Sequence, residues 1–311
     1  MKALSPSASH SGPVSSLNGF TLIELLVIVA MMAVLTAVVL PALAGTKPNV
    51  PAFQCLNNQR QIILGWQMYA SDNNGLVPPN DYPYTTAYYT YPNKFQLKNW
   101  AVGTMVQPLD AGALGFRELT DPNSLLSAYI TNASVYFCPA DNYIDSRSHA
   151  YHVRSYSMNS AVGTIWSYYY LSGLPLGAPV KGGWLPGNVY NPNQTTWLTY
   201  GKMSSFTRPG PANTWIFIDE NAYSINDGSF VMPAAASPGA TYLLDFASGR
   251  HGKADVLAFA DGHVIVHQWQ DSRTYTPAGI VQPGGGSSTS TLQSPDNLDC
   301  FYLAPLTSAR R

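Results

Sequence analysis

Acidic residues gather in one part of a chain that otherwise carries little charge. Of its 311 residues, 11% are charged and 17 are Asp or Glu. Six of these acids fall in one short C-terminal region, at Asp219, Glu220, Asp227, Asp245, Asp255 and Asp261. Hard cations such as calcium bind several carboxylate and carbonyl oxygens supplied by loops beside strand ends. We therefore predict a calcium site formed by Asp219, Glu220, Asp227 and Asp245, and extending to His251, Asp261 and His263.

Other roles for these residues stay open. Asp227 and Asp261 each precede a glycine and could simply form turns, while His251 could brace a hairpin through a hydrogen bond. A zinc or iron site is a further alternative, because His251, His263 and His267 lie close in sequence. Residues four apart on a strand, such as His263 and His267, share a face. Zinc needs a further tight ligand, and the sequence marks none.

Catalytic motifs are absent from the sequence. It has no Gly-x-Ser-x-Gly elbow, no P-loop and no His-Glu-x-x-His. Asp219 and Glu220 are a poor pair for glycoside hydrolysis, because adjacent strand residues point to opposite faces. We therefore expect that the protein is not an enzyme.

Runs of β-branched and aromatic residues predict the strands that would position the acidic residues. Residues 214–219 have the composition that strands prefer. Asp261-Gly262 separates two apolar runs, 254–260 and 263–269, and Asp-Gly in that position is the strongest short-range signal for a hairpin. We also predict strands at 135–137, 155–159 and 298–306.

Helices are expected in the N-terminal part of the chain and at residues 122–130. Apolar residues recur at three- and four-residue steps between Leu56 and Ala70, the pattern of a helix with one buried stripe. Before it, Pro48 and Pro51 interrupt the preceding helical stretch, because proline removes a backbone donor and restricts the residue before it.

An apolar stretch without charge, 25–43, lies near the N-terminus and directly follows Glu24. Its length is sufficient for a helix to cross a bilayer. Placing a carboxylate at the start of such a helix in a membrane costs free energy, so we expect Glu24 to have a charged partner or a functional role. An ordinary signal peptide or a plain anchor does not explain the block Gly19-Phe20-Thr21-Leu22-Ile23-Glu24.

That block closely resembles the cleavage and methylation site of type IV prepilins and type II secretion pseudopilins. The resemblance implies that prepilin peptidase cuts after Gly19 and methylates Phe20. It also implies that Glu24 pairs with the N-terminal amine of a neighbouring subunit, and it places Pro41 at the helix proline of the family. Opposite charges that meet in a low dielectric make such a buried carboxylate tolerable.

His251 and Asp261-Gly262 have the spacing His-x9-Asp-Gly. This spacing resembles the C-terminal signature of a large subgroup of prepilin-like proteins. Other segments resemble blocks of the same subgroup, and they include Asn57-Asn58-Gln59-Arg60-Gln61-Ile62, Tyr136-Phe137-Cys138-Pro139-Ala140-Asp141, Asp219-Glu220 and Ile225-Asn226-Asp227-Gly228.

Composition limits the remaining functions. A formal net charge of -1 gives no basic surface for nucleic acid. The 20 Tyr, 25 Gly and 24 Pro suggest a loop-rich extracytoplasmic domain, and the Tyr-rich run between 77 and 100 could be a sugar-stacking surface. Cys55, Cys138 and Cys300 are an odd number, so one disulfide would leave one thiol free, and the pairing is not determined by the sequence.

These observations lead to one set of expectations. The fold is expected to be α+β and pilin-like, with a long N-terminal transmembrane or spine helix packed on a C-terminal antiparallel sheet. The domains are a leader at 1–19, a membrane and filament-core helix at 20–44, its kinked continuation at 45–75 and a globular domain at 76–311.

The protein is expected in the inner membrane as a single-pass protein, with its C-terminal domain periplasmic or extracellular. Its partners would be other pilin or pseudopilin subunits. The alternative function is a membrane-tethered module that binds a carbohydrate or another ligand.

Overall fold

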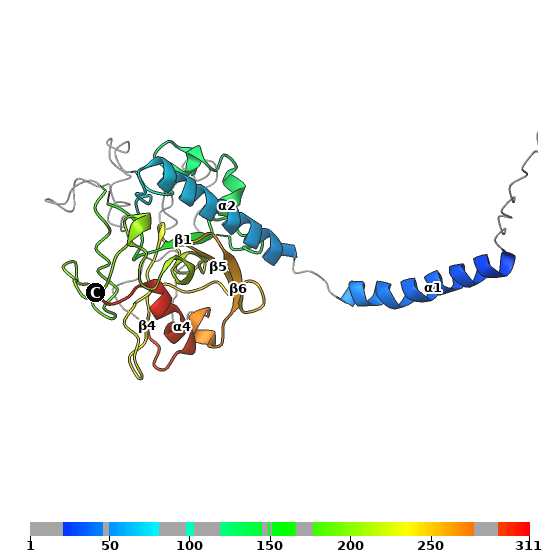
Figure 1. Ribbon diagram of the computed structural model, residues 1–311. Helices are drawn as coiled ribbons and strands as arrows, with labels where there is room; N and C mark the ends of the chain where they lie inside the picture. The colour runs from blue at the N-terminus through cyan, green and yellow to red at the C-terminus, as the bar shows by residue number, and fades with distance from the viewer. Residues whose placement is uncertain are drawn as a thin grey trace, which may run out of the picture. The chain divides into compact units, whose positions relative to one another are not determined.

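The chain divides into two compact units, Met1–Pro48 and Asn49–Arg311. The computed structural model describes residues 21–45, 50–80, 98–102, 119–144, 149, 151–165, 177–276 and 292–311. In the first unit, helix α1 spans Leu22–Gly45. The second unit begins with helix α2, Val50–Asp72, and contains every described strand (Figure 1).

The second unit is built on a five-stranded sheet with the strand order β3-β1-β2-β5-β6. Neighbouring strands are antiparallel, except that β1 and β3 run parallel. The separate strands β4 and β7 form a second, two-stranded sheet. The strand bounds are Tyr156–Asn159 (β1), Trp215–Asp219 (β2), Ser229–Phe230 (β3), Tyr242–Leu243 (β4), Ala254–Phe259 (β5), Val264–Gln268 (β6) and Leu292–Gln293 (β7).

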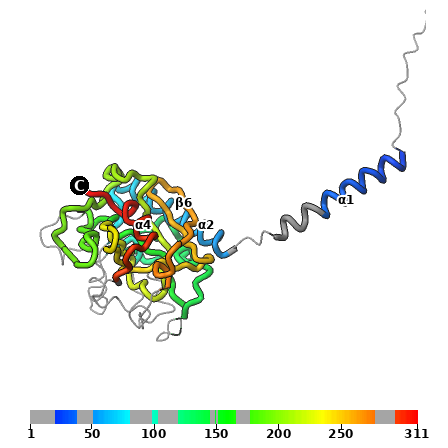
Figure 2. Tube along the Cα trace, turned by 90° about the horizontal axis from the view of Figure 1, so that it is seen from below, coloured from blue at the N-terminus to red at the C-terminus, as the bar shows by residue number. Residues whose placement is uncertain are grey.

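Helix α2 packs against the sheet through the apolar stripe that its sequence predicts. Ile62, Ile63 and Trp66 are buried, and they belong to the same core cluster as Phe217 and Val256 of the sheet. Side chains alternate across a strand, so the intervening residues of β5 face a second cluster on the other side. Figures 1 and 2 show α2 and the C-terminal helix α4, Leu298–Thr307, as two separate helical elements of this unit.

Hydrogen bonds fix the register between α2 and the sheet. Gln59 Nε2 donates to the carbonyl oxygen of Val256 at 2.9 Å, and Gln67 Nε2 donates to that of Ala260 at 3.0 Å. These hydrogen bonds fix the position of α2 because sliding the helix would leave a buried amide or carbonyl group without a partner, which costs free energy. Both halves of α2 are therefore held in place, Gln59 over β5 and Gln67 over the residue that follows β5.

The predicted hairpin is confirmed: β5 and β6 pair antiparallel around the Asp261-Gly262 turn. Gly262 has φ +96°, a left-handed conformation that glycine adopts without steric cost. The predicted strands at 155–159 and 214–219 are confirmed as β1 and β2.

Three predicted elements take another form. The expected strand at 135–137 is wrong, because Ala133–Tyr136 is a 3-10 helix that Asn132 caps through its side chain. The expected tail strand is also wrong, because Leu298–Thr307 is helix α4. The side chain of Asn297 caps this helix by accepting from the backbone N–H groups of Asp299 and Cys300. The helix predicted at 122–130 is a shorter 3-10 helix, Leu125–Ala128.

The expected pilin-like arrangement requires two corrections. No long spine helix spans the described N-terminal region, because α1 and α2 are separate helices assigned to different compact units. The sheet is mixed rather than antiparallel, since β3 joins β1 in parallel. The helix that packs on the sheet is therefore α2.

The expected single-pass location in the inner membrane is corrected as well. Among the residues that the structure describes, no helix has both the length and the apolarity needed to cross a bilayer.

Candidate functional site

Two cysteines from distant parts of the chain meet in the core of the second unit. Cys55 lies in the first half of α2, and Cys138 follows the 3-10 helix Ala133–Tyr136. Both are fully buried, and both are free thiols. The hydroxyl of Tyr156 on β1 donates to Cys55 Sγ at 3.3 Å. These contacts bring α2, β1 and the Cys-Pro-Ala-Asp segment to one point.

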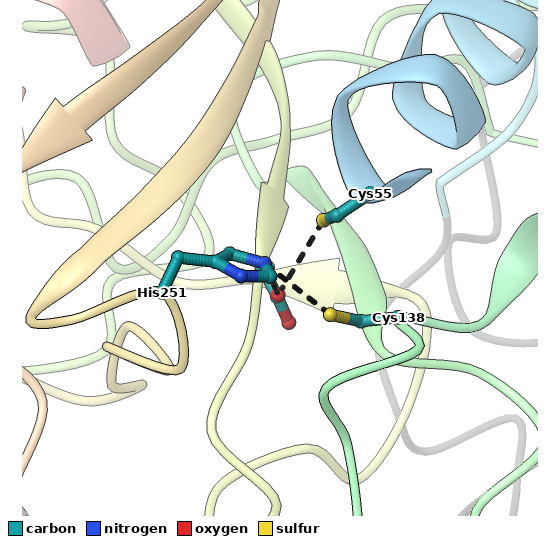
Figure 3. Close-up of side chains that lie close together, drawn as sticks. Cys55, Cys138 and His251 are labelled. Atoms are coloured by element: carbon teal, nitrogen blue, oxygen red, sulfur yellow. Dashed lines mark hydrogen bonds and ion pairs between the residues drawn. The ribbon is translucent and has the colours of Figure 1, made fainter. Parts of the chain in front are cut away.

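Asp219 and His251 complete a group of four side chains around this point. Asp219 ends β2, and His251 lies in the loop before β5. His251 Nε2 is 3.4 Å from Cys138 Sγ and 3.7 Å from Asp219 Oδ2, and Cys55 Sγ is 3.8 Å from the same oxygen. All four ligand atoms lie within 4.8 Å of one another (Figure 3). We call these residues the Cys-His-Asp cluster.

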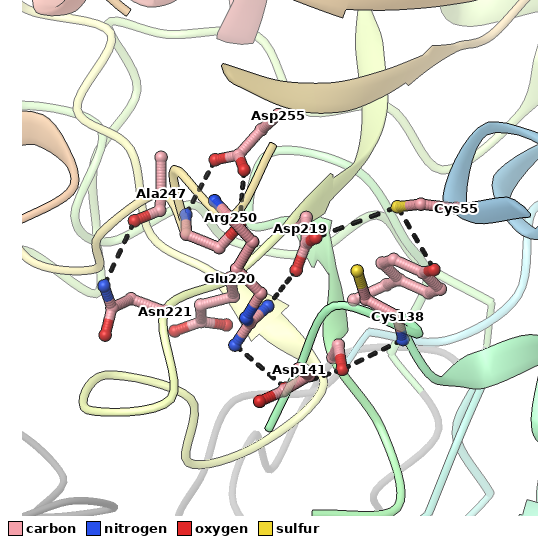
Figure 4. A network of polar contacts seen from close by, with 12 residues as sticks. Cys55, Cys138, Asp141, Asp219, Glu220, Asn221, Ala247, Arg250 and Asp255 are labelled. Carbon is pink, nitrogen blue, oxygen red and sulfur yellow. Dashed lines mark hydrogen bonds and ion pairs between the residues drawn. The ribbon is translucent and has the colours of Figure 1, made fainter. Parts of the chain in front are cut away.

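Arg250 supplies the positive charge beside the Cys-His-Asp cluster. One of its guanidinium nitrogens pairs with Asp219 Oδ1, and the other lies 2.9 Å from Asp141 Oδ2 (Figure 4). The Asp219 carboxylate therefore has one oxygen on Arg250 and the other directed toward the two cysteines and His251. Asp141 also accepts from the Ser155 hydroxyl at 2.7 Å.

The protonation states within the cluster follow from burial. Burial raises the pKa of the Cys55 thiol, and the hydrogen bond with Cys55 together with burial raises that of Cys138. Burial and the nearby Arg250 charge lower the pKa of His251 to about 4. His251 is therefore neutral near pH 7, with a nitrogen lone pair available, and its approach to Asp219 is not an ion pair.

The predicted acidic set separates into three places. Asp219 belongs to the Cys-His-Asp cluster, whereas its neighbour Glu220 lies on the other side of the strand and accepts from Ser224 Oγ at 2.9 Å. Asp261 lies at the exposed hairpin turn, where its Oδ1 is 2.6 Å from His263 Nδ1. His267 stacks on Tyr302 instead of joining His251.

Glu220, Asp227 and Asp245 form a second buried acidic group near Arg154. The Arg154 guanidinium donates to the backbone oxygen of Asp227, and its charge favours the ionised forms of Glu220 and Asp227. Burial opposes ionisation and raises the pKa of Glu220 to about 8 and that of Asp227 to about 6. Asp245 Oδ2 accepts from the backbone of Val231. Calcium binding by this set stays a prediction.

Within the described part of the chain, one group of His, Cys, Asp and Glu side chains has ligand atoms close enough to hold a metal, and it is the Cys-His-Asp cluster. The sequence predicted two of its members, Asp219 and His251. It missed Cys55 and Cys138, since their separation of more than eighty residues matches no local metal motif. The one sequence feature that pointed to Cys138 was the resemblance of the segment Tyr136-Phe137-Cys138-Pro139-Ala140-Asp141 to a block of the prepilin-like subgroup.

The predicted processing site lies at the edge of the described residues. Gly19 and Phe20 fall outside them, as does most of the Tyr-rich run. Glu24 is described, and it forms a capping box with Thr21 at the start of α1. Glu24 Oε2 accepts from the Thr21 backbone and hydroxyl, both at 2.9 Å, and the Glu24 backbone donates to Thr21 Oγ1 at 3.3 Å.

Comparison of the chain with family models, with curated proteins and with solved structures gave no match.

Proposed function

We propose that the chain is a structural subunit of a filament of the type II secretion pseudopilus or type IV pilus class. In this proposal, prepilin peptidase cleaves after Gly19 and methylates Phe20. The α1 helices of successive subunits then pack side by side and form the apolar centre of the filament. The role is assembly and not catalysis.

The exposed apolar surface of α1 is the observation that carries this proposal. Its large apolar side chains, from Leu22 to Leu35, are exposed by 41–77%. Fully burying one such side chain stabilises by about 1.5–3 kcal/mol. A helix apolar on all sides is stable when other apolar surface covers it, and identical helices of neighbouring subunits supply such surface.

Glu24 is the one acid in this helix, and its position supports a role in subunit register. Hydrogen bonds from Thr21 lower the pKa of Glu24, so the carboxylate is charged near neutral pH. Cleavage after Gly19 would create a positive amine on Phe20, one residue before the cap. The carboxylate of one subunit could then pair with the amine of the next.

Two substitutions separate this charge pairing from helix capping. Gln at the third helical position preserves a capping box, whereas Ala removes it. We expect Glu24→Gln and Glu24→Ala to abolish assembly alike, because both remove the charge. Assembly is measured in the producing cells with a photo-crosslinking residue in place of Val29, as a ladder of linked subunits. A wild-type ladder for Glu24→Gln would show that capping is the role of Glu24 and would contradict the register mechanism.

A further inference from the structure

We propose that Cys55, Cys138, Asp219 and His251 bind one zinc ion that fastens α2 to the sheet. The site is independent of filament assembly, because all four residues lie in the second unit, Asn49–Arg311. Its ligands come from α2, the segment after the 3-10 helix, the end of β2 and the loop before β5.

The distances between the ligand atoms fit a tetrahedral ion. Zinc lies about 2.3 Å from sulfur and about 2.0–2.2 Å from nitrogen or oxygen, so ligand atoms of a tetrahedron are about 3.4–3.8 Å apart. The separations in the cluster are 3.4 Å from Cys138 Sγ to His251 Nε2, 3.7 Å from His251 Nε2 to Asp219 Oδ2 and 3.8 Å from Asp219 Oδ2 to Cys55 Sγ. All the other pairs of ligand atoms lie within 4.8 Å, so an ion would draw them together by at most about 1 Å.

The types of ligand favour zinc over the other common ions. Two sulfurs, an imidazole nitrogen and one carboxylate oxygen suit a borderline-soft, tetrahedral ion. Calcium and magnesium take oxygen ligands and would leave both sulfurs without a partner. All four residues are buried, with three at 0% exposure and His251 at 6%. A closed site with four protein ligands is structural, since catalytic zinc keeps a position for water.

The charges around the Cys-His-Asp cluster are suited to the replacement of thiol protons by a zinc ion. When Asp219 is ionised beside Arg250, zinc binding replaces two thiol protons with one doubly charged ion, so the net charge of the buried cluster is unchanged. Arg250 holds Asp219 Oδ1 and leaves Oδ2 free for the ion. The Tyr156 hydroxyl donates to Cys55 Sγ, and such an outer hydrogen bond stabilises and orients a thiolate ligand.

The first experiment measures zinc in the wild-type full-length chain, purified in mild detergent without chelator and then titrated with Zn²⁺ against a chromophoric chelator. We expect one zinc per chain, and a melting temperature about 10 °C higher with zinc than after chelation. Cobalt in place of zinc should give the intense visible bands of a tetrahedral thiolate site. These measurements on the wild-type protein require no variant to fold.

The second experiment uses a matched pair of variants. Cys138→Ala should lose stoichiometric zinc and the cobalt bands, whereas Cys300→Ala should retain both. Cys300 is a suitable control because it is also buried but lies on α4, in the core cluster on the other side of the sheet. Zinc retained by Cys138→Ala at full stoichiometry would overturn the assignment of the ligands.

A disulfide between Cys55 and Cys138 is the competing use of the two sulfurs. It would leave one titratable thiol in the denatured chain and lower the mass by about 2 Da. Absence of stoichiometric zinc after titration, with either this disulfide or three free thiols, would overturn the proposal.

Discussion

Cys138 Sγ lies 3.4 Å from His251 Nε2, although 113 residues separate the two in the chain. The contact joins the Cys-Pro-Ala-Asp segment to the histidine of the His-x9-Asp-Gly spacing. Cys55 of α2 and Asp219 of β2 meet them at the same point. Segments that the sequence presents as separate motifs thus form one buried polar centre, and that centre holds α2 against the sheet.

Arg250 should be essential for the stability of this centre. Replacing it with Met leaves the buried carboxylates of Asp219 and Asp141 without their cation. Removing one partner of a buried ion pair costs about 3–5 kcal/mol. Denaturant unfolding, followed by tryptophan fluorescence, measures the loss.

The control for Arg250→Met is Arg273→Met, which removes an ion pair with Asp271 at a more exposed position. Exposed pairs contribute about 0–1 kcal/mol, so this variant should unfold close to the wild type. Equal losses in the two variants would contradict a special role for Arg250.

Asp227 should make the folded state less stable as pH rises. Burial raises its pKa from 3.8 to about 6, so the folded state holds this proton more tightly than the unfolded state. The contribution to stability is therefore fully present below about pH 4 and is lost as pH rises through about 6. Relative to Asp227→Asn, the wild type should lose about 2–3 kcal/mol between pH 4 and pH 7.

Unfolding is measured for both proteins at each pH in the presence of chelator, so that metal binding does not contribute. Asp271→Asn is the control, because Arg273 lowers the pKa of Asp271 and its titration lies below this pH range. Parallel stability curves for the wild type and Asp227→Asn would refute the effect of burial on Asp227.

Gly262 should be needed for the contact between the hairpin and α2. Its φ of +96° strains any residue with a side chain, and an alanine Cβ would lie 3.1 Å from Gln67 Nε2. That nitrogen donates to the Ala260 carbonyl oxygen. We expect Gly262→Ala to cost about 1–2 kcal/mol by denaturant unfolding.

Gly252→Ala provides the comparison, because Gly252 has φ +75° and no atom within 4 Å of an added Cβ. Gly252→Ala should lower the free energy of unfolding only by the backbone strain, about 1 kcal/mol. If Gly252→Ala proves as costly as Gly262→Ala, the contact with Gln67 contributes nothing.

Local patterns predicted the parts of the fold that are stabilised locally. The helical stripe of α2, the β-branched strand β2 and the Asp-Gly hairpin each carry their signal within a few residues, and all three are confirmed. The strand predicted at 298–306 is wrong. The helix formed there is set by the Asn297 cap, a signal that the sequence contained.

The polar centre could be predicted only in part. Clustering of acids along the chain identified Asp219 and its neighbours, but strand alternation places Asp219 and Glu220 on opposite sides of β2. Cys55 and Cys138 join Asp219 only through the packing of α2 on the sheet, a contact between distant segments. The spine helix was expected from apolar length and from the resemblance of the N-terminal block to prepilins, whereas α1 and α2 are separate helices.

The mass of the mature N-terminal peptide, isolated from the producing cells, tests the filament proposal most directly. We predict a chain that begins at Phe20 and carries one methyl group on its amine, which adds about 14 Da to that peptide. A mature chain that still begins at Met1, or that begins beyond Ala44, would contradict the proposal.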